Sequence, residues 1–406
     1  MGIEIGLYIH IPFCRSKCAY CDFASVAGRE HLWRPYLDVL LAEIAAIPPL
    51  RPITLYVGGG TPTLWPAEYL TAVIEAVRSA GLPAGAEATV EANPGTVDEA
   101  KLAALRRAGY NRISLGVQST QEANLRLLGR IHSYAEAGDA VRWARAAGFD
   151  NLSIDLISGL PGQTVAEWQT DLARALELES EHLSAYGLSL EEGTPLAAAV
   201  ARGALPEPDA DIWADMYLST EEILAAAGYR HYEISNWASA PDALPPDPGA
   251  ARQATRAPRD WVRRSGPAAR LLTCGHNLIY WRNEPYLGLG SGAHSSLQGK
   301  RFARLADPAA YVAARPADRV SFMEEIGPSL EMAETAILGL RLVAGLERDR
   351  FRHRFGPDPV EWFREPVSWA QGHGLLEYDD YAVYLTQRGR LLSNEVFQRL
   401  LPTTEP

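Results

Sequence analysis

Apolar, β-branched runs that alternate with amphipathic stretches are the feature that most restricts how this chain can fold. Six runs are predicted to be strands, at residues 5–11, 53–59, 88–93, 112–117, 151–157 and 182–188. The stretches between them have helical periodicity, and three begin with a capping-box pattern: Thr96 with Glu99, Ser133 with Glu136, and Thr164 with Glu167. This alternation predicts an α/β fold with a parallel sheet. Six units fit an open (β/α)6 partial TIM barrel, although a closed eight-stranded barrel and a doubly wound sheet share the same local pattern.

The chain of 406 residues is longer than one typical domain, so a second, smaller domain is expected. Residues 238–270 are rich in Pro, Ala and Arg, which is typical of a flexible insertion. Beyond it, helical patterns at 329–343 and 360–372 precede a strand-like pair at 375–385 and a helix from Thr386, an order that suggests a winged helix. The expected divisions are a barrel at 1–237, the insertion at 238–270, a connecting segment at 271–305 and a mainly helical, winged-helix-like C-terminal domain at 306–406.

The charge balance restricts the partners and the compartment. A formal net charge of -12 argues against a broad grip on nucleic acid, which needs clustered Lys and Arg. No stretch has the uninterrupted apolar length of a membrane span, and the start MGIEIG leads directly into a strand pattern rather than a signal peptide. We therefore expect a cytosolic protein that is not an integral membrane protein.

Three of the four cysteines lie in the segment CRSKCAYC, directly after the first predicted strand. Thiolates from Cys14, Cys18 and Cys21 can hold one [4Fe–4S] cubane and leave its fourth iron open. S-adenosylmethionine (SAM) can chelate such an iron through its amino and carboxylate groups, and the reduced cluster can then pass an electron to the sulfonium. The alternative is a zinc site completed by His10, but common zinc sites use C-x2-C pairs, so the unequal spacing favours the cluster.

Polar or flexible residues lie at, near or just after the ends of the other strands, with Asp155 within its strand, toward the edge where the carboxyl ends should meet. In α/β barrels this edge carries the active site. Each acid alone fits a buried structural role, and the glycine run fits a tight turn, but their joint position favours a site. Arg130 fits a carboxylate clamp or a solvated helix charge. The edge residues are Gly58, Gly59, Gly60 and Thr61 after the second strand, then Glu91, Gln118, Asp155, Tyr186 and Gly187.

The segment CGHNLIYW contains Cys274, His276, Tyr280 and Trp281. Imidazole is a common axial ligand of haem iron, and neighbouring aromatic rings can cover a porphyrin face. The residues alone favour a hydrogen-bonded core histidine and a buried cysteine instead. His294, in GLGSGAHSS, is a second candidate that has the same ordinary alternative.

Six ordered motifs together resemble the HemN and HemW branch of the radical SAM proteins: YIHIPFCRSKCAYCDF, GGGTPT, EANP, GVQS, DLISGLPGQT and CGHNLIYW. HemN members are oxygen-independent coproporphyrinogen III oxidases and carry a further Cys where this chain has Phe23. That difference, the short N-terminus and the motif around His276 are similar to HemW members, which are haem chaperones. The resemblance implies haem delivery to client proteins such as respiratory enzymes and allows a homodimer. It leaves catalysis open, with coproporphyrinogen oxidation as the alternative function.

The resemblance also implies roles for individual residues. Cys14, Cys18 and Cys21 would hold the cluster, and His276 would bind haem. No residue is given a catalytic role. The positions that would contact SAM are Tyr8, Tyr20, Gly59, Gly60, Thr61, Glu91, Gln118, Arg130, Asp155 and Gly187.

Overall fold

The computed structural model describes residues 2–239 and 272–402, which form two compact units. The first unit comprises Met1–Thr220 and Pro285–Glu324, and the second comprises Glu221–Glu284 and Glu325–Pro406. The expected flexible insertion at 238–270 lies outside the described residues except for its first two positions, which end a strand.

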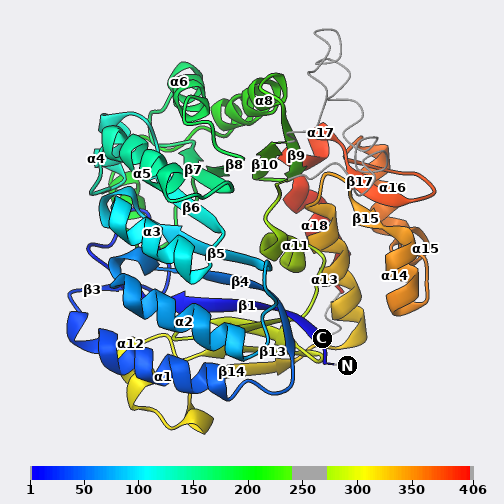
Figure 1. Ribbon diagram of the computed structural model, residues 1–406. Helices are drawn as coiled ribbons and strands as arrows, with labels where there is room; N and C mark the ends of the chain where they lie inside the picture. The colour runs from blue at the N-terminus through cyan, green and yellow to red at the C-terminus, as the bar shows by residue number, and fades with distance from the viewer. Residues whose placement is uncertain (1, 240–271, 403–406) are drawn as a thin grey trace. The chain divides into compact units, whose positions relative to one another are not determined.

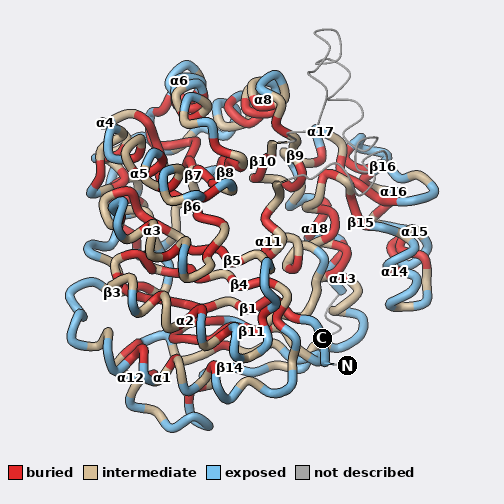
Figure 2. Tube along the Cα trace, viewed as in Figure 1, coloured by how far each residue is buried: buried red, intermediate tan, exposed pale blue. Residues whose placement is uncertain are grey.

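All six predicted strands are present in the first unit and are parallel (Figure 1). Neighbouring strands are hydrogen-bonded in chain order, as expected for right-handed β/α units. Figure 2 shows the strands as largely buried, which explains their continuous apolar sequences. The strands are β1 (Glu4–Ile11), β4 (Arg51–Gly59), β5 (Glu87–Ala92), β6 (Arg112–Gln118), β7 (Leu152–Ser158) and β8 (His182–Gly187).

Amphipathic helices connect the strands and pack against one another along the outside of the sheet (Figure 1). This arrangement is the open (β/α)6 barrel that the sequence predicts. Short elements, β2 (Phe13–Cys14), β3 (Val26–Ala27) and the 3-10 turns η1 (Glu30–Leu32), η2 (Pro62–Leu64) and η3 (Pro94–Thr96), follow the first strands. The helices are α1 (Trp33–Ala45), α2 (Ala67–Ser79), α3 (Glu99–Ala108), α4 (Glu122–Leu127), α5 (Tyr134–Ala146), α6 (Val165–Leu176), α7 (Pro195–Ala201) and α8 (Ala210–Ala226), the last of which contains the boundary of the unit.

Two of the three predicted capping boxes are confirmed. Ser133 and Thr164 each accept a hydrogen bond from the backbone N–H three residues on, and the Glu side chain there accepts one in return. The prediction at Thr96 was wrong. Asp98 caps α3 by accepting from the Lys101 N–H at 2.7 Å, while the Thr96 hydroxyl donates to the Asn93 carbonyl oxygen inside a 3-10 turn. Because the Thr96 hydroxyl is bonded within this turn, the helix is capped two residues later, at Asp98.

Residues after the CGHNLIYW segment extend the barrel sheet. β11 (Tyr286–Leu289) pairs in parallel with β1. β12 (His294–Leu297) is antiparallel to β11, and β13 (Lys300–Arg304) is antiparallel to β12. α12 (Pro308–Ala313), η4 (Pro316–Asp318) and β14 (Val320–Glu325) complete this part. The expected domains instead divided these residues between a connecting segment at 271–305 and a C-terminal domain at 306–406.

The second unit has a small three-stranded sheet packed with helices, as expected for a winged-helix-like domain. Its core consists of buried aliphatic and aromatic side chains from these helices and strands. The elements are β9 (Tyr229–Glu233), β10 (Asn236–Ser239), α11 (Gly275–Trp281), α13 (Pro328–Leu340), β15 (Leu346–Glu347), α14 (Arg348–Phe355), α15 (Pro359–Trp362), α16 (Arg364–Gly372), β16 (Leu376–Tyr378), β17 (Ala382–Leu385), α17 (Gln387–Leu391) and α18 (Ser393–Leu400).

Candidate functional site

The cysteine loop begins at the carboxyl end of β1. Cys14 ends the short strand β2, and Cys18 and Cys21 follow in a turn in which the Cys21 N–H donates to the Cys18 carbonyl oxygen at 3.3 Å. The Ala19 N–H donates to the Leu128 carbonyl oxygen at 3.0 Å, and the Ala19 carbonyl oxygen accepts from the Leu196 N–H at 2.8 Å. These bonds hold the loop to the segment after α4 and to the start of α7.

The glycine run after β4 lies directly beside this loop. The N–H groups of Gly60 and Thr61 donate to the carbonyl oxygens of Ile11 and Phe13, each at 2.8 Å. A Cβ atom on Gly60 would stand 2.8 Å from the Phe13 oxygen and 3.0 Å from the Cys14 sulfur, so only glycine allows this approach. The run therefore brings the second strand against the cysteine strand.

The three thiols are partly buried and near one another. Burial raises the pKa of Cys14 and of Cys21, and the neighbouring Cys18 thiol raises both further. Donors surround them: the Thr61 hydroxyl lies 3.7 Å from the Cys14 sulfur, and the Arg130 guanidinium donates to the Cys18 sulfur at 3.4 Å. Thiolates in a cubane accept such hydrogen bonds, so this donor set fits a [4Fe–4S] cluster.

The zinc alternative finds less support. Both ring nitrogens of His10 are engaged, because Nδ1 lies 3.0 Å from the Tyr8 hydroxyl and Nε2 lies 2.9 Å from the Ala24 carbonyl oxygen. Burial lowers the pKa of His10, which favours a neutral ring that donates to Ala24 and accepts from Tyr8.

Glu91 is the centre of a buried network at the carboxyl ends of β1, β4 and β5. Its carboxylate accepts from the Tyr56 hydroxyl at 2.8 Å and from the Gly59 N–H at 3.0 Å. Tyr56 in turn stacks on Tyr8, its register partner in β1. Burial raises the pKa of Glu91 to about 7, despite these donors. Gly59 has φ +115°, and a Cβ atom there would stand 2.7 Å from the His10 ring.

Gln118 and Arg130 meet at the end of β6. Gln118 has φ 70°, which is unusual for a residue with a side chain, and lies at an irregularity in the pairing with β7. Arg130 donates from Nη2 to the Gly116 carbonyl oxygen at 2.7 Å while Nη1 contacts the Cys18 sulfur. Its Nε atom is buried and has no acceptor in the described part of the chain. An unused donor beside the cysteine loop fits a ligand carboxylate.

Asp155 lies on β7 and faces a group of serine hydroxyls. It accepts from Ser114 at 3.0 Å and from Ser153 at 3.2 Å. Burial raises its pKa, and the hydrogen bonds from Ser184 and Ser114 oppose that increase. The serine hydroxyls therefore satisfy the Asp155 carboxylate, as they would for an acid with a structural role. A contact with a ligand would be additional.

The aromatic Tyr20 and the glycine Gly187 are both in closely packed surroundings. Tyr20 packs against an apolar cluster that contains Leu128 and Leu160, and burial raises the pKa of its hydroxyl. A Cβ atom on Gly187 would stand 2.5 Å from the indole nitrogen of Trp213. A Cβ atom on Gly159 would likewise stand 2.8 Å from the Trp213 ring, so this ring covers the ends of β7 and β8 closely.

Sequence reasoning missed Tyr56, which anchors Glu91, and Trp213, which covers Gly187. Tyr56 could have been found from the strand alternation, since it shares a face with Thr54 and Gly58 on β4. Trp213 left no such signal, because a tryptophan on a helix is usually an ordinary packing residue.

His276 belongs to the second unit. It lies on α11, is 1% exposed, and its Nε2 atom is 3.0 Å from the Tyr280 hydroxyl. Cys274 is the buried N-cap residue of this helix. The second histidine candidate, His294, is exposed on β12 of the first unit. The two histidine candidates therefore belong to different units.

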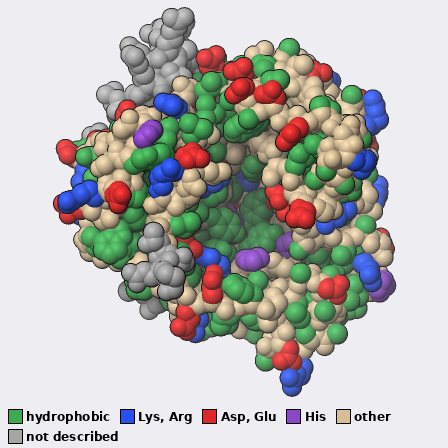
Figure 3. Space-filling model, turned by 180° about the vertical axis from the view of Figure 1, so that it is seen from behind, with side chains coloured by type: hydrophobic (Ala, Val, Ile, Leu, Met, Phe, Trp, Pro, Cys, Tyr) green, Lys and Arg blue, Asp and Glu red, His purple; other side chains and the backbone are tan. Residues whose placement is uncertain are grey.

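Charged side chains of both signs are mixed on the surface that Figure 3 shows, where Lys and Arg are interspersed with Asp and Glu. No helix among residues 2–239 and 272–402 combines the length and the apolar character needed to cross a membrane.

Comparisons with known proteins assign the family. The Radical SAM superfamily model matches residues 8–175, and the HemN C-terminal domain model matches residues 330–392. The heme chaperone HemW of Lactococcus lactis is 34% identical over 97% of this chain and 96% of its own length. That of Bacillus subtilis is 32% identical over 97% and 98%. The chain belongs to the HemW family of radical SAM proteins.

The fold assignment has independent structural support. Coproporphyrinogen III oxidase (HemN) from Escherichia coli superimposes with a TM-score of 0.79 over 98% of this chain and 90% of that one, at 24% identity. At this identity the likeness shows the fold alone. Membership of the HemW family and the radical SAM barrel confirm the fold and the family that the sequence motifs indicate.

Proposed function

We propose that this HemW family member is a haem chaperone that binds haem and delivers it to client proteins, on a scaffold that holds a [4Fe–4S] cluster and SAM. The observation that carries the proposal is the near full-length similarity to curated heme chaperones, which extends through both units. The same chain keeps the cysteine loop and the polar strand ends that a radical SAM site requires.

In the first unit, Cys14, Cys18 and Cys21 would hold the cluster. When bound, such a cluster can supply an electron to SAM. Arg130 would take the SAM carboxylate with its unused Nε–H, and Gly59, Gly60 and Thr61 would let backbone groups approach the ligand. Tyr8, Tyr20, Glu91, Gln118, Asp155 and Gly187 would complete the contacts with SAM.

In the second unit, His276 would bind the haem iron. Its burial and its partner Tyr280 mean that the ring must change partner before Nε2 can ligate a metal. A histidine that is held by an exchangeable hydrogen bond suits a protein that must release haem as well as bind it. We also propose that the protein acts in the cytosol and transfers haem to respiratory enzymes.

Haem titration of the anaerobically reconstituted protein tests this function. We expect a Soret band that saturates with added haem, and a weaker affinity in the His276→Ala variant. The matched control is His353→Ala, since His353 is exposed on α14 of the same unit. If wild-type protein shows no saturable haem spectrum, the chaperone function is wrong. If His276→Ala binds with unchanged affinity and spectrum, His276 is not the ligand.

Coproporphyrinogen III oxidation is the alternative, because HemN shares the fold. Phe23 stands where HemN members carry their additional Cys, and it is 62% exposed. Conversion of coproporphyrinogen III to protoporphyrinogen by the reconstituted protein, with SAM and a reductant, would replace the chaperone proposal. We expect no such conversion.

A further inference from the structure

A pocket of about 240 Å³ lies entirely within the second unit. Its walls are formed by β9, α11, α13 with the segment after it, and α14. The lining is mainly apolar and includes Leu278, Val343 and Phe351. Ligand sites for whole drug-sized molecules are usually larger than this, so the pocket is suited to one part of a larger apolar ligand.

The pocket and His276 use different faces of α11. Leu278, Trp281 and Arg282 line the pocket, and their spacing of three and four residues places them on one side of the helix. His276 and Tyr280 do not line it; they contact each other instead. One short helix therefore presents the haem-binding candidate on one face and the pocket lining on another.

Hydrogen-bond donors border this apolar space. The charged residues of the lining, within the described chain, are Arg282, Arg350 and Arg354 against the single acid Glu347. The indole Nε1 of Trp281 is buried and has no acceptor in the described residues. Arg350 and Arg354 are paired with acids outside the lining, whereas Arg282 has no ion pair within the described residues. Arg282 is therefore the lining cation that favours an anionic group, and the Trp281 N–H is a buried donor that such a group could satisfy.

The arginines of α14 are held in position by ion pairs. Arg350 pairs with Glu284, and Arg354 pairs with Glu331 at 2.6 Å while donating to the Asn283 carbonyl oxygen at 2.8 Å. Since these contacts restrict both side chains at the pocket, little of their conformational entropy remains to be lost on binding.

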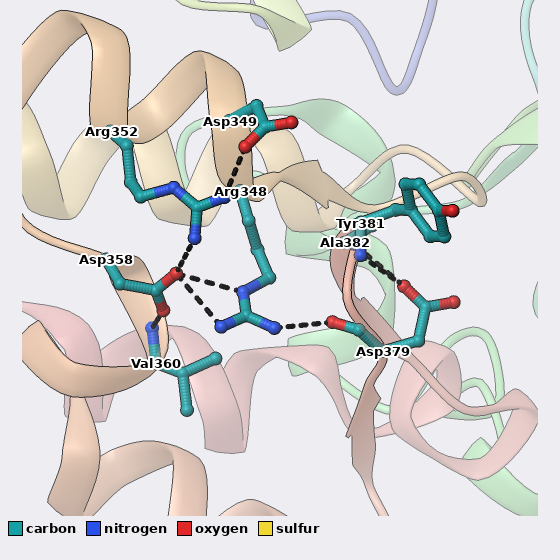
Figure 4. Close-up of polar contacts among 8 residues, drawn as sticks. All are labelled: Arg348, Asp349, Arg352, Asp358, Val360, Asp379, Tyr381 and Ala382. Carbon is teal, nitrogen blue, oxygen red and sulfur yellow. Dashed lines mark hydrogen bonds and ion pairs between the residues drawn. The ribbon is translucent and has the colours of Figure 1, made fainter.

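A second network fixes the other side of α14 (Figure 4). Arg348 and Arg352, one helical turn apart, both donate to the same carboxylate oxygen of Asp358, at 3.0 and 2.8 Å. Arg348 also donates to the Asp379 carbonyl oxygen at 2.7 Å. The helix is thus anchored through one face, and the residues that line the pocket lie on another face.

The histidine that lines the pocket is not available as a metal ligand. Nδ1 of His231 lies 3.2 Å from Glu221, and Nε2 lies 3.2 Å from the Ile234 carbonyl oxygen. The ring also stacks on Trp237 with 4.3 Å between centroids. The described residues of the pocket therefore offer apolar walls and N–H donors for a ligand carboxylate, but no imidazole with a ring nitrogen that is not already engaged.

We propose that this pocket is a porphyrin subsite that binds a ring edge and one propionate of haem, independently of iron. The inference rests on the proposed function and adds to it a site that recognises a carboxylate of the ligand. A porphyrin matches the lining because its ring is flat and apolar and its propionates project from one edge. Arg282 would pair with the propionate at the mouth, and the Trp281 N–H would be the buried donor.

Binding of iron-free protoporphyrin IX to the full-length protein tests the subsite, because this probe has no iron for His276 to ligate. Its dimethyl ester removes the two negative charges and keeps the ring. We expect the acid to bind about tenfold more tightly than the ester, as measured by porphyrin fluorescence, because a charge-assisted pair is lost. Arg282→Gln should reduce this difference to about twofold, while the exposed control Arg364→Gln should keep it.

A cavity-filling variant provides a second test. Ala344 lines the pocket, and Ala344→Phe should occupy its volume and weaken binding of both porphyrins at least about tenfold, in a variant whose thermal unfolding shows that it is folded. Dodecanoate, which carries a carboxylate on a flexible chain, should fail to displace the porphyrin. If dodecanoate displaced the porphyrin with equal affinity, the pocket would bind any amphiphilic carboxylate, and the assignment to a porphyrin would be wrong.

The remaining outcomes separate the subsite from the function. If the protein binds haem but not iron-free porphyrin, or binds acid and ester equally, the subsite is wrong and the chaperone proposal stands. The same holds if folded Arg282→Gln and Ala344→Phe variants bind as the wild type does. If the protein binds neither haem nor protoporphyrin, both proposals are wrong.

Discussion

The Nε2 atom of His276 lies 3.0 Å from the hydroxyl oxygen of Tyr280, with the two rings edge-on at a centroid distance of 5.1 Å. The hydroxyl thus forms a hydrogen bond with Nε2, the ring nitrogen that is farther from the backbone and more accessible to a large ligand. Since a net hydrogen bond contributes about 1 kcal/mol, we expect Tyr280→Phe to bind haem about fivefold more tightly. Titration followed at the Soret band measures the change.

Tyr378→Phe is the matched control, because Tyr378 belongs to the same unit and its side chain is exposed. It should leave haem affinity unchanged. An unchanged or weaker affinity in Tyr280→Phe, with a normal melting temperature, would mean that the hydroxyl supports haem binding or takes no part in it.

Arg130 donates to the Cys18 sulfur, and hydrogen bonds to cluster sulfurs raise reduction potentials. Arg130→Gln should therefore lower the cluster potential, by on the order of 50 mV, in a titration followed by EPR. Arg126→Gln, at an exposed position on α4, is the control. Equal potentials in Arg130→Gln and wild type, at full cluster occupancy, would show that this contact does not act on the bound cluster.

Gly59→Ala should destabilise the first unit. The added Cβ would stand 2.7 Å from the His10 ring, and φ +115° is strained for any L side chain. We expect a loss of about 1–3 kcal/mol in free energy of unfolding, measured by urea denaturation. Gly138→Ala is the comparison, because Gly138 lies inside α5 with only the end of Arg142 nearby. A free energy of unfolding equal to that of the wild type for Gly59→Ala would contradict the close approach of Gly59 to the His10 ring.

The buried Glu91 predicts a pH dependence of stability. Burial raises its pKa from 4.5 to about 7 in the folded protein, so the folded state keeps a proton that the unfolded state releases. The associated stability is fully present below pH 4.5 and is lost as the pH rises through 7. The loss is roughly 3 kcal/mol in total, and Glu91→Gln should abolish this part of the pH profile. Unfolding at pH 5 and pH 8 compares the two proteins; equal pH slopes would contradict the prediction.

Several features of the site were predictable because they depend on short stretches of chain. The positions of Glu91 and Gln118 at strand ends follow from β/α alternation, since parallel strands must present their carboxyl ends at one edge. The mistake at Thr96 is also local: Asp98 is an equally good N-cap, and the 3-10 turn used the Thr96 hydroxyl first.

The sequence by itself determined the six strands, the spacing of Cys14, Cys18 and Cys21 and, through its ordered motifs, the family. Backbone periodicity and ligand spacing are set by neighbours along the chain, so they can be read without a structure. Only the tertiary structure decided that β11 pairs with β1, that Tyr56 holds Glu91 and that α11 presents His276 and the pocket lining on different faces. These relationships join residues on separate elements, and their geometry depends on how the elements pack rather than on any local pattern.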